Sequence, residues 1–345
     1  MIECKNLTKS FGTLEAVSDF CLNLNKQEFL SILGPSGCGK STLLRLIAGL
    51  EVPSRGQVFF KNQEISGKKI YLPPEDRKFS MIFQDFALFP HLSVEKNIAY
   101  GVTGSRIEKQ NRVNELLELV SLRHIASKMP HQISGGEQQR IAVARALAPK
   151  PRLILMDEPF SNLDYQLRLQ LRREIREILK QEGVPTILVT HDQVEAITFS
   201  ERILLMYQGK LIQAGTPKEI YQNPKTLWAS SFVGEANHLS VEWEEKSLKS
   251  SFGFVDVPSE IGKETRILMV RPEDFFIESV PDKESNGVIK TVEFSGAVQT
   301  AVVELKSGEE IQVSGSPHFM WILEETVKIS AKRYSCFNSS GCRLD

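Results

Sequence analysis

The chain has 345 residues, of which 41% are hydrophobic and 25% charged, a composition that excludes a largely disordered protein and allows about two domains. Lysine plus arginine (42) nearly balances aspartate plus glutamate (43), so the formal net charge of −1 gives no general attraction to nucleic acid or anionic lipid. No apolar run approaches the ~20 residues of a membrane-spanning helix, and the first residues contain no apolar signal core, which predicts a cytoplasmic protein.

The first two thirds of the chain alternate strand and helix patterns. The clearest predicted strands are residues 29–33, 151–156 and 185–190, and the clearest predicted helices are residues 41–50 and 163–181. The first of these strands runs directly into a glycine-rich loop. Strands that alternate with helices favour an α/β fold with a mainly parallel sheet that is covered on both faces.

The pattern changes twice further along. Between about residues 86 and 148 helical spacing dominates, over 108–120 and 134–147, which indicates a helical insertion. After about residue 237 short alternating strands appear, including a hairpin of 300–305 with 311–313. We therefore expect an α/β domain over residues 1–235 and a small β-barrel domain over 236–345.

The loop after the first predicted strand fits the phosphate-binding pattern G-x-x-x-x-G-K-[ST]. Its residues are Gly34, Pro35, Ser36, Gly37, Cys38, Gly39, Lys40, Ser41 and Thr42. Glycines let backbone N–H groups close around phosphate oxygens, and the following helix directs its positive end toward them. Lys40 is expected to reach the β- and γ-phosphates and the Ser41 hydroxyl to bind Mg²⁺, which predicts an ATP site.

A second signal is the buried strand 153–156, which ends in the carboxylates Asp157 and Glu158. Buried strands rarely end in paired charges unless the charges face a cation or a reaction centre. Asp157 is expected to hold Mg²⁺ and Glu158 to polarise the attacking water. An acidic pair at an ordinary surface strand end is the alternative, and the phosphate loop makes that alternative less favoured.

The third signal is the stretch Ile133-Ser134-Gly135-Gly136-Glu137-Gln138, which resembles the L-S-G-G-Q signature of ABC ATPases. The order along the chain is also similar to that family, with Phe11 before the loop, then Gln84, the signature, Asp157-Glu158, the stretch 161–164 and His191. The resemblance implies a P-loop NTPase core with a helical subdomain. It also implies that Ser134, Gly135 and Gly136 cap the γ-phosphate bound to a second copy of the chain.

The same resemblance assigns four more roles. Phe11 would stack on adenine, with an aromatic packed in the core as the alternative. Gln84 would contact Mg²⁺ or water and report the nucleotide state to a membrane partner. His191 would contact the γ-phosphate, and Asp164 would link the two active sites of the homodimer.

The C-terminal stretch Val270-Arg271-Pro272-Glu273-Asp274 and the strands near 287–313 resemble the oligomer-binding-like TOBE domain of importer ATPases. The apolar segment 84–94 is similar to the groove that grips a permease helix, with ordinary core packing as the alternative. The resemblance implies a peripheral subunit on the cytoplasmic face of the inner membrane, with permease subunits and, indirectly, a substrate-binding protein as partners. Nucleic acid is not expected.

Residues 86–102 look most similar to the ferric-iron branch of these importers, so ferric iron is the expected cargo. Polyamine, sulfate or thiosulfate, molybdate and sugar are the alternatives. A soluble ABC ATPase that acts on nucleic acid or ribosomes is the alternative from another class, but it usually has paired cassettes or coiled-coil insertions.

Two residues stand out within these motifs. Glu137 replaces the glutamine of the signature and adds a negative charge, and we expect activity to survive this change. Cys38 lies beside Lys40 at a helix N-terminus, which predicts a lowered thiol pKa. Alkylation of Cys38 is therefore expected to block ATP hydrolysis, and ATP is expected to protect the thiol.

Overall fold

The computed structural model describes residues 1–161, 164–244 and 246–344. The chain divides into two compact units, Met1–Lys218 and Glu219–Asp345, so the division falls earlier than the expected boundary between residues 235 and 236. The cause lies within the second unit, where Arg271 donates hydrogen bonds to the carbonyls of Tyr221, Ser230, Gly234 and Glu235. These bonds attach residues 219–235 to the β-rich part of the chain.

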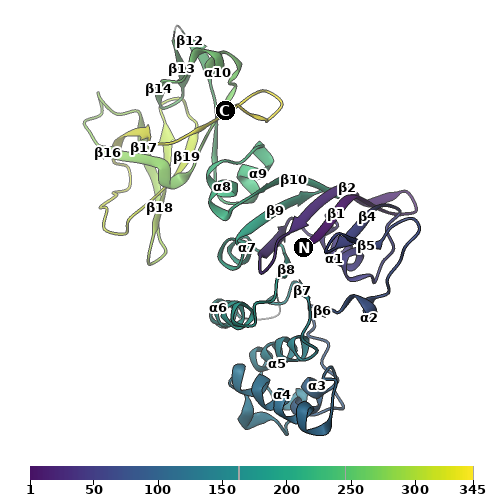
Figure 1. The fold of residues 1–345 in the computed structure, drawn as a ribbon. Helices are drawn as coiled ribbons and strands as arrows, with labels where there is room; N and C mark the ends of the chain where they lie inside the picture. The colour runs from purple at the N-terminus through teal and green to yellow at the C-terminus, as the bar shows by residue number, and fades with distance from the viewer. Residues whose placement is uncertain (162–163, 245, 345) are drawn as a thin grey trace. The chain divides into compact units, whose positions relative to one another are not determined.

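The first unit is built on a six-stranded sheet in the order β10-β9-β3-β8-β7-β6 (Figure 1). Its strands are β3 (Phe29–Leu33), β6 (Phe79–Ile82), β7 (Leu153–Asp157), β8 (Thr186–Thr190), β9 (Arg202–Tyr207) and β10 (Lys210–Gly215). Every neighbouring pair is parallel except β9 and β10. The mainly parallel sheet predicted from the sequence is therefore confirmed, and β6, β9 and the edge strand β10 add to the three predicted strands.

A second sheet, which the sequence analysis did not identify, is antiparallel in the order β2-β1-β4-β5. Its strands are β1 (Ile2–Phe11), β2 (Leu14–Leu24), β4 (Arg55–Phe60) and β5 (Gln63–Ser66). One hydrophobic core contains residues of this sheet, of helix α1 (Lys40–Ala48) and of one face of the parallel sheet. Successive strand residues point to opposite faces, and Leu30 and Ile32 of β3 join this core while Phe29 joins the other one.

Helices form the core on the opposite face of the parallel sheet. They are α3 (Val94–Ala99), α4 (Arg106–Leu119), α5 (Gly135–Leu147), α6 (Tyr165–Gln181) and α7 (Gln193–Phe199), with short α2 (Pro74–Arg77) before β6. Ser105 and Ser134 begin α4 and α5 with capping boxes closed by Glu108 and Glu137. The stretch 86–148 thus folds as the predicted helical insertion, at the lower end of the first unit in Figure 1.

The second unit contains three antiparallel sheets that share one core. The first sheet contains β11 (Asn237–Ser240), β15 (Ile267–Val270), β21 (Ser335–Phe337) and β22 (Arg343–Leu344). The second sheet contains β12 (Glu242–Glu244), β13 (Ser247–Ser250) and β14 (Gly253–Val255). The third sheet contains β16 (Phe275–Ser279), β20 (Thr326–Ala331), β17 (Gly287–Phe294), β18 (Gln299–Leu305) and β19 (Glu310–Gly315). Helices α8 (Pro217–Gln222), α9 (Leu227–Phe232) and α10 (Ser259–Glu264) complete it. The predicted hairpin is β18 with β19, in which Val303 pairs with Ile311.

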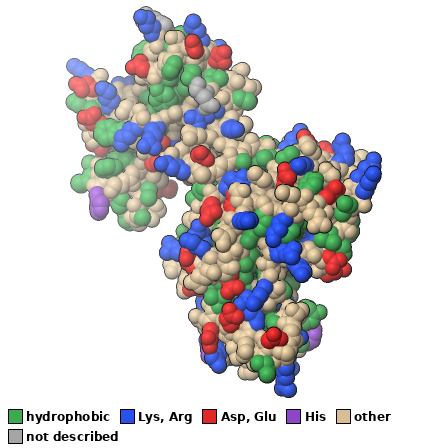
Figure 2. Space-filling view, viewed as in Figure 1, with side chains coloured by type: hydrophobic (Ala, Val, Ile, Leu, Met, Phe, Trp, Pro, Cys, Tyr) green, Lys and Arg blue, Asp and Glu red, His purple; other side chains and the backbone are tan. Residues whose placement is uncertain are grey.

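The surface carries both signs of charge. On the face shown in Figure 2, basic and acidic side chains are spread over each unit, as the near-zero net charge suggests. None of the helices among the described residues is both long and apolar enough to cross a lipid bilayer.

Candidate nucleotide-binding and catalytic site

The predicted catalytic motifs follow strands that end at one edge of the parallel sheet. Leu33 at the end of β3 pairs with Thr190 at the end of β8, and Asp157 at the end of β7 pairs with Val189. Because parallel strands share one direction, the segments that follow them emerge side by side, and ligands bind outside the carboxyl ends of such strands. The phosphate loop, Glu158 and His191 are therefore neighbours, although more than 150 residues separate the first from the last.

The loop from Gly34 to Gly39 connects β3 to α1, whose first three residues are Lys40, Ser41 and Thr42. Gly39 has φ +105°, and a Cβ placed there would lie 2.0 Å from the carbonyl oxygen of Ala16 on β2. Gly37 has φ +78° and would place its Cβ in open space. The absence of a side chain at Gly39 therefore allows the loop to pack closely against β2, whereas the absence of one at Gly37 keeps the open side of the loop accessible.

Lys40 lies over this loop. Its side chain is only 4% exposed, and its Nζ donates to the carbonyl oxygens of Gly34 and Pro35, each at 2.9 Å. The N-cap of α1 is Gly39, which has no side chain to accept a hydrogen bond from the N–H groups of the first turn. An ammonium group and an uncapped helix N-terminus at one loop suit a phosphate group.

Ser41 and Asp157, which are both predicted to bind Mg²⁺, are in direct contact. The Ser41 hydroxyl donates to Asp157 Oδ1 at 2.8 Å. Burial raises the pKa of Asp157, the Ser41 hydrogen bond opposes that rise, and the nearby Glu158 adds to it. A cation between these oxygens would stabilise the ionised carboxylate. Hydroxyl and carboxylate oxygens are ligands that suit Mg²⁺, which commonly shares its coordination with phosphate oxygens.

Glu158 and His191 form a direct contact. Glu158 Oε2 lies 3.0 Å from His191 Nδ1, and the histidine side chain is half exposed. Glu158 has φ +47°, uncommon for a residue other than glycine, and its N–H donates to the carbonyl of Val189 on β8. This contact favours the tautomer with the proton on Nδ1 and leaves Nε2 available to a ligand.

A polar network behind His191 was not recognised from the sequence. Asp192 caps α7 by accepting from Glu195 N–H, and its own N–H donates to the Thr190 hydroxyl. That hydroxyl donates to the buried Glu195 carboxylate at 2.6 Å. Arg168 of α6 lies 3.4 Å from Asp192 and also donates to the carbonyl of Ser161, three residues after Glu158. An N-cap aspartate directly after His191, before a helical pattern, was the available sequence signal.

Phe11 ends β1 at the hairpin to Leu14 and is 47% exposed, with Lys9 Nζ 4.9 Å from the ring centre. The alternative of an aromatic packed in the core is therefore wrong. Ala16, two residues past Leu14, contacts the phosphate loop at Gly39. This contact places the exposed ring on the hairpin beside the loop, where the adenine role remains a prediction.

Gln84 is an exposed residue that follows β6, in which Ile82 pairs with Met156 of β7. It therefore leaves the sheet at the same edge as Asp157. Its contact with Mg²⁺ or the attacking water stays a prediction.

The signature residues lie away from this edge. Ser134 caps α5, with Gly135 and Gly136 in its first turn, and α5 belongs to the helical insertion. Glu137 Oε2 accepts from Ser134 N–H at 2.7 Å and from the Ser134 hydroxyl at 2.9 Å. These hydrogen bonds lower the pKa of Glu137 and keep its charge beside Ser134. The S-x-x-E spacing of a capping box was visible in the sequence, but its meaning was missed.

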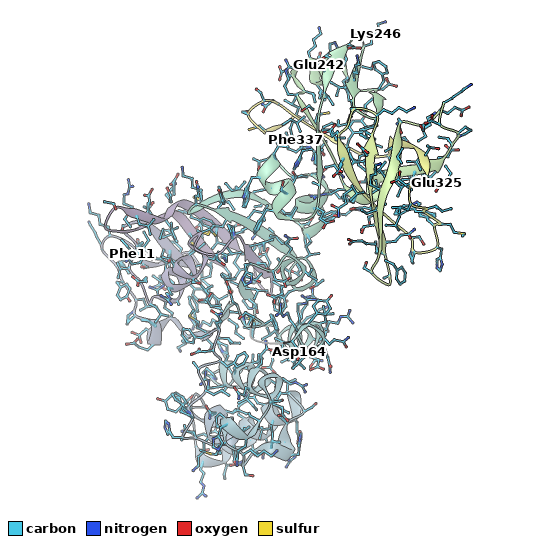
Figure 3. The ribbon with its side chains drawn as sticks, turned by 180° about the vertical axis from the view of Figure 1, so that it is seen from behind. Phe11, Asp164, Glu242, Lys246, Glu325 and Phe337 are labelled. Carbon is cyan, nitrogen blue, oxygen red and sulfur yellow. The ribbon has the colours of Figure 1, made fainter. Side chains whose placement is uncertain are left out.

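Asp164 begins α6 and accepts from Leu167 N–H at 3.0 Å. The signature helix packs nearby, since a Cβ at Gly136 would meet Leu167 and Leu171 of α6 at 3.0 to 3.2 Å. Figure 3 shows Asp164 on a different part of the first unit from Phe11. The neighbouring residues 162 and 163 of the expected 161–164 motif lie outside the described residues.

The expectation for Cys38 is wrong in one respect. Cys38 is only 6% exposed, and burial raises the pKa of its thiol, although Lys40 and backbone hydrogen bonds lower it in part. Desolvation of the thiolate outweighs the attraction of the lysine. We therefore expect the Cys38 thiol to be alkylated slowly rather than quickly.

Comparisons with known proteins cover both units. The ABC transporter family profile matches residues 17–161, and the TOBE domain profile matches residues 268–337. The spermidine/putrescine import ATP-binding protein PotA of Salmonella typhi is 38% identical over 352 residues, with 96% of this chain and 92% of the relative covered. PotA of Vibrio cholerae is 39% identical, with 91% and 86% covered.

A solved structure adds a similar fold. The ATP-binding cassette MJ0796, a dimer in a post-hydrolysis state bound to ADP and Pi, is 33% identical with a TM-score of 0.55. The match covers 63% of this chain and 99% of that chain.

Proposed function

Since the chain belongs to the ABC transporter family, as an importer-type ATPase with a TOBE domain, we propose that it hydrolyses ATP at the sheet edge described above and thereby drives uptake through membrane partners. The observation that carries this proposal is the convergence of Lys40, Ser41, Asp157, Glu158 and His191 at one edge. At this edge a phosphate-binding loop with its lysine, two oxygen-bearing side chains suited to a cation and a carboxylate suited to act as a base lie together.

Each side chain has a task in this mechanism. Lys40 exchanges the carbonyls of Gly34 and Pro35 for the β- and γ-phosphate oxygens. Ser41 and Asp157 would hold Mg²⁺, which would supply neutralisation of the phosphate charge. Glu158 accepts a hydrogen bond from the attacking water and takes its proton, while the water oxygen bonds to the γ-phosphorus and the bond between the γ-phosphorus and the leaving oxygen of ADP breaks. His191, fixed through Nδ1, directs Nε2 to the γ-phosphate, and Phe11 stacks on adenine.

The second half of the site comes from another copy of the chain. Ser134, Gly135 and Gly136 lie in the helical insertion, apart from the phosphate loop of their own chain. In a head-to-tail homodimer they would cap the partner's γ-phosphate, with Asp164 at the same interface. The dimeric form of the MJ0796 cassette supports this arrangement.

For the membrane partners we propose permease subunits gripped by residues 84–94, with the chain at the cytoplasmic face of the inner membrane. A soluble ABC ATPase is less favoured, because the similarity to import proteins extends over both units. The names of these relatives also move the proposed cargo from ferric iron to a polyamine. Uptake of radiolabelled spermidine and of ferric citrate by cells with and without the gene separates these two cargoes.

The ATPase proposal is tested with Glu158→Gln. Glutamine keeps the shape but cannot take the proton, so turnover should fall at least about a hundredfold, the scale of general-base catalysis. An ATP-bound dimer should then accumulate in size-exclusion chromatography. Glu118→Gln, at an exposed ion pair on α4, is the matched control. A Glu158→Gln variant that remains monomeric with ATP would contradict the shared-site mechanism.

A further inference from the structure

The segment that follows Gln84 has an unusual backbone. Phe86 and Ala87 have φ of +61° and +46°, so two consecutive residues other than glycine adopt the left-handed region. This conformation places Cβ too close to the following carbonyl and persists only where the surrounding structure holds it. A specific contact must therefore maintain the turn.

Arg145 of α5 makes that contact. Its Nη1 donates to the carbonyl oxygen of Ala87 at 2.6 Å, and its Nη2 donates to that of Phe86 at 2.9 Å. The guanidinium carbon also lies 5.4 Å from the centre of the Phe89 ring. A planar guanidinium satisfies two adjacent carbonyls and an aromatic face together, which a lysine cannot do.

The next part of the segment is fixed by Asn97 of α3. This fully buried amide accepts from Phe89 N–H and donates to the carbonyls of Phe89, Leu92 and Ser93. Arg145 and Asn97 together hold the backbone from Phe86 to Ser93. Arg145 binds the carbonyls of both left-handed residues, while Phe86 N–H donates to the carbonyl of Phe83 and the Phe86 side chain is buried in the core.

Arg145 lies on the same helix as the signature residues. The same helix, α5, begins at Gly135, directly after its cap Ser134, and ends at Leu147. One end therefore carries the signature residues, and the last turn holds the segment after Gln84. A hydrogen-bonded helix transmits displacement as a rigid element, so movement of the signature end also moves the clamped turn.

We propose that Arg145 is a positioning residue that locks the Phe86–Ala87 turn to the signature helix and thereby fixes Gln84 relative to the nucleotide. The proposal rests on the function proposed above, in which Gln84 serves catalysis. Arg145 itself touches neither nucleotide nor metal, and acts through the backbone that carries Gln84.

The test compares Arg145→Gln and Arg145→Lys with Arg152→Gln. Arg152 is an exposed arginine that stacks on Phe60 at 5.6 Å, so its variant removes a similar cation–π contact elsewhere. In hydrogen exchange of the full chain, Arg145→Gln should accelerate the amides of residues 85–89 at least about tenfold and leave those of the parallel sheet unchanged. Arg145→Lys should resemble Arg145→Gln, whereas Arg152→Gln should resemble the wild type.

Kinetics give a second readout. Displacement of Gln84 should lower kcat for ATP about tenfold while the KM for ATP stays within about twofold, because the phosphate loop is untouched. Equal exchange in Arg145→Gln and wild type would overturn the proposal. If the wild type itself lacks ATPase activity, the proposed function fails, and the exchange result still decides whether Arg145 holds the turn.

A rescue variant separates this role from a general loss of stability. Ala87→Gly removes the steric penalty of positive φ, so the turn needs the clamp less. Ala87→Gly should therefore restore at least half of the kcat lost in Arg145→Gln, with the Ala87→Gly single variant as the reference for the double variant. Additive effects of the two substitutions would show that Arg145 does not act through this turn.

Discussion

The two loop glycines Gly39 and Gly37 allow a sharp test because their surroundings differ. Gly39→Ala places a Cβ 2.0 Å from the Ala16 carbonyl oxygen at φ +105°, whereas Gly37→Ala places one in open space at φ +78°. A left-handed alanine costs about 1–2 kcal/mol at either position. Displacing packed backbone adds about 1–3 kcal/mol at Gly39 alone.

The expected loss is therefore about 2–5 kcal/mol for Gly39→Ala and about 1–2 kcal/mol for Gly37→Ala. For a unit of this size each kcal/mol lowers the melting temperature by about 2–4 °C. Gly39→Ala should thus melt clearly below Gly37→Ala in calorimetry. Gly37→Ala should instead weaken ATP binding, measured with a fluorescent ATP analogue, because its Cβ occupies the open side of the loop.

Two results would refute this reasoning. Equal melting temperatures of the two variants would show that the contact of Gly39 with β2 is not tight. An unchanged ATP affinity of Gly37→Ala would show that phosphate does not approach the open side of the loop.

Four further predictions concern Cys38, Glu137 and Arg271. Cys38 should react with N-ethylmaleimide at least about tenfold more slowly than the exposed Cys21, because burial raises the pKa of the Cys38 thiol. Glu137→Gln should lower the KM for ATP about two- to fivefold by removing a charge beside Ser134. Folding lowers the pKa of Glu137, so its ionised carboxylate stabilises the folded chain above the unfolded pKa of about 4.3. The free energy of unfolding of the wild type, measured by urea titration, should therefore lose its advantage over that of Glu137→Gln as the pH falls below this value. Arg271→Ala should destabilise the second unit by at least about 3 kcal/mol, because four carbonyls lose a charged donor. Tryptophan fluorescence reports unfolding of this unit, since all three tryptophans of the chain lie in it.

The controls and contrary outcomes for these predictions are direct. Mass spectrometry of singly labelled peptides compares the two cysteines in one sample, and equal rates would contradict the burial argument. A higher KM in Glu137→Gln would show that the carboxylate helps rather than hinders phosphate binding. Arg271→Lys is the control that keeps the positive charge but lacks the two donor nitrogens of the planar guanidinium. An Arg271→Ala variant as stable as wild type would contradict the conclusion that Arg271 holds residues 219–235.

The network behind His191 suggests how the site keeps its geometry. Thr190, Asp192 and Glu195 fix the start of α7, and Arg168 links this start to the segment after Glu158. The two residues that face the γ-phosphate in the proposed mechanism, Glu158 and His191, are therefore attached to one hydrogen-bonded frame. Movement of α6 would affect both residues together.

Several features followed from the sequence because their causes are local. The buried strand 29–33, the glycine loop and the following helix are contiguous, and β3 has the predicted bounds. The acidic end of β7 and the cap at Ser134 are local in the same sense. Short-range sterics, hydrogen bonding and hydrophobic periodicity determine such elements wherever they lie in the fold.

Other features depended on long-range packing. The antiparallel sheet of β1, β2, β4 and β5 was missed as a whole because the pairing that unites its two local hairpins, β1 with β4, joins residues on either side of α1. The thiol of Cys38 looked reactive beside Lys40, but burial, which the sequence does not show, reversed its pKa shift. The Arg145 contact spans 58 residues to Ala87 and has no local sequence signal.

The sequence by itself thus determined that this chain has a phosphate loop, an acidic strand end and a signature segment, because each motif is short and contiguous. Only the tertiary structure decided which of them share a site. The parallel strand order brings Ser41, Asp157, Glu158 and His191 to one edge, while the helical insertion carries Ser134 away from it. The physical reason is that side-chain proximity across a sheet depends on strand order and register, which are set by the burial of the whole core rather than by neighbouring residues.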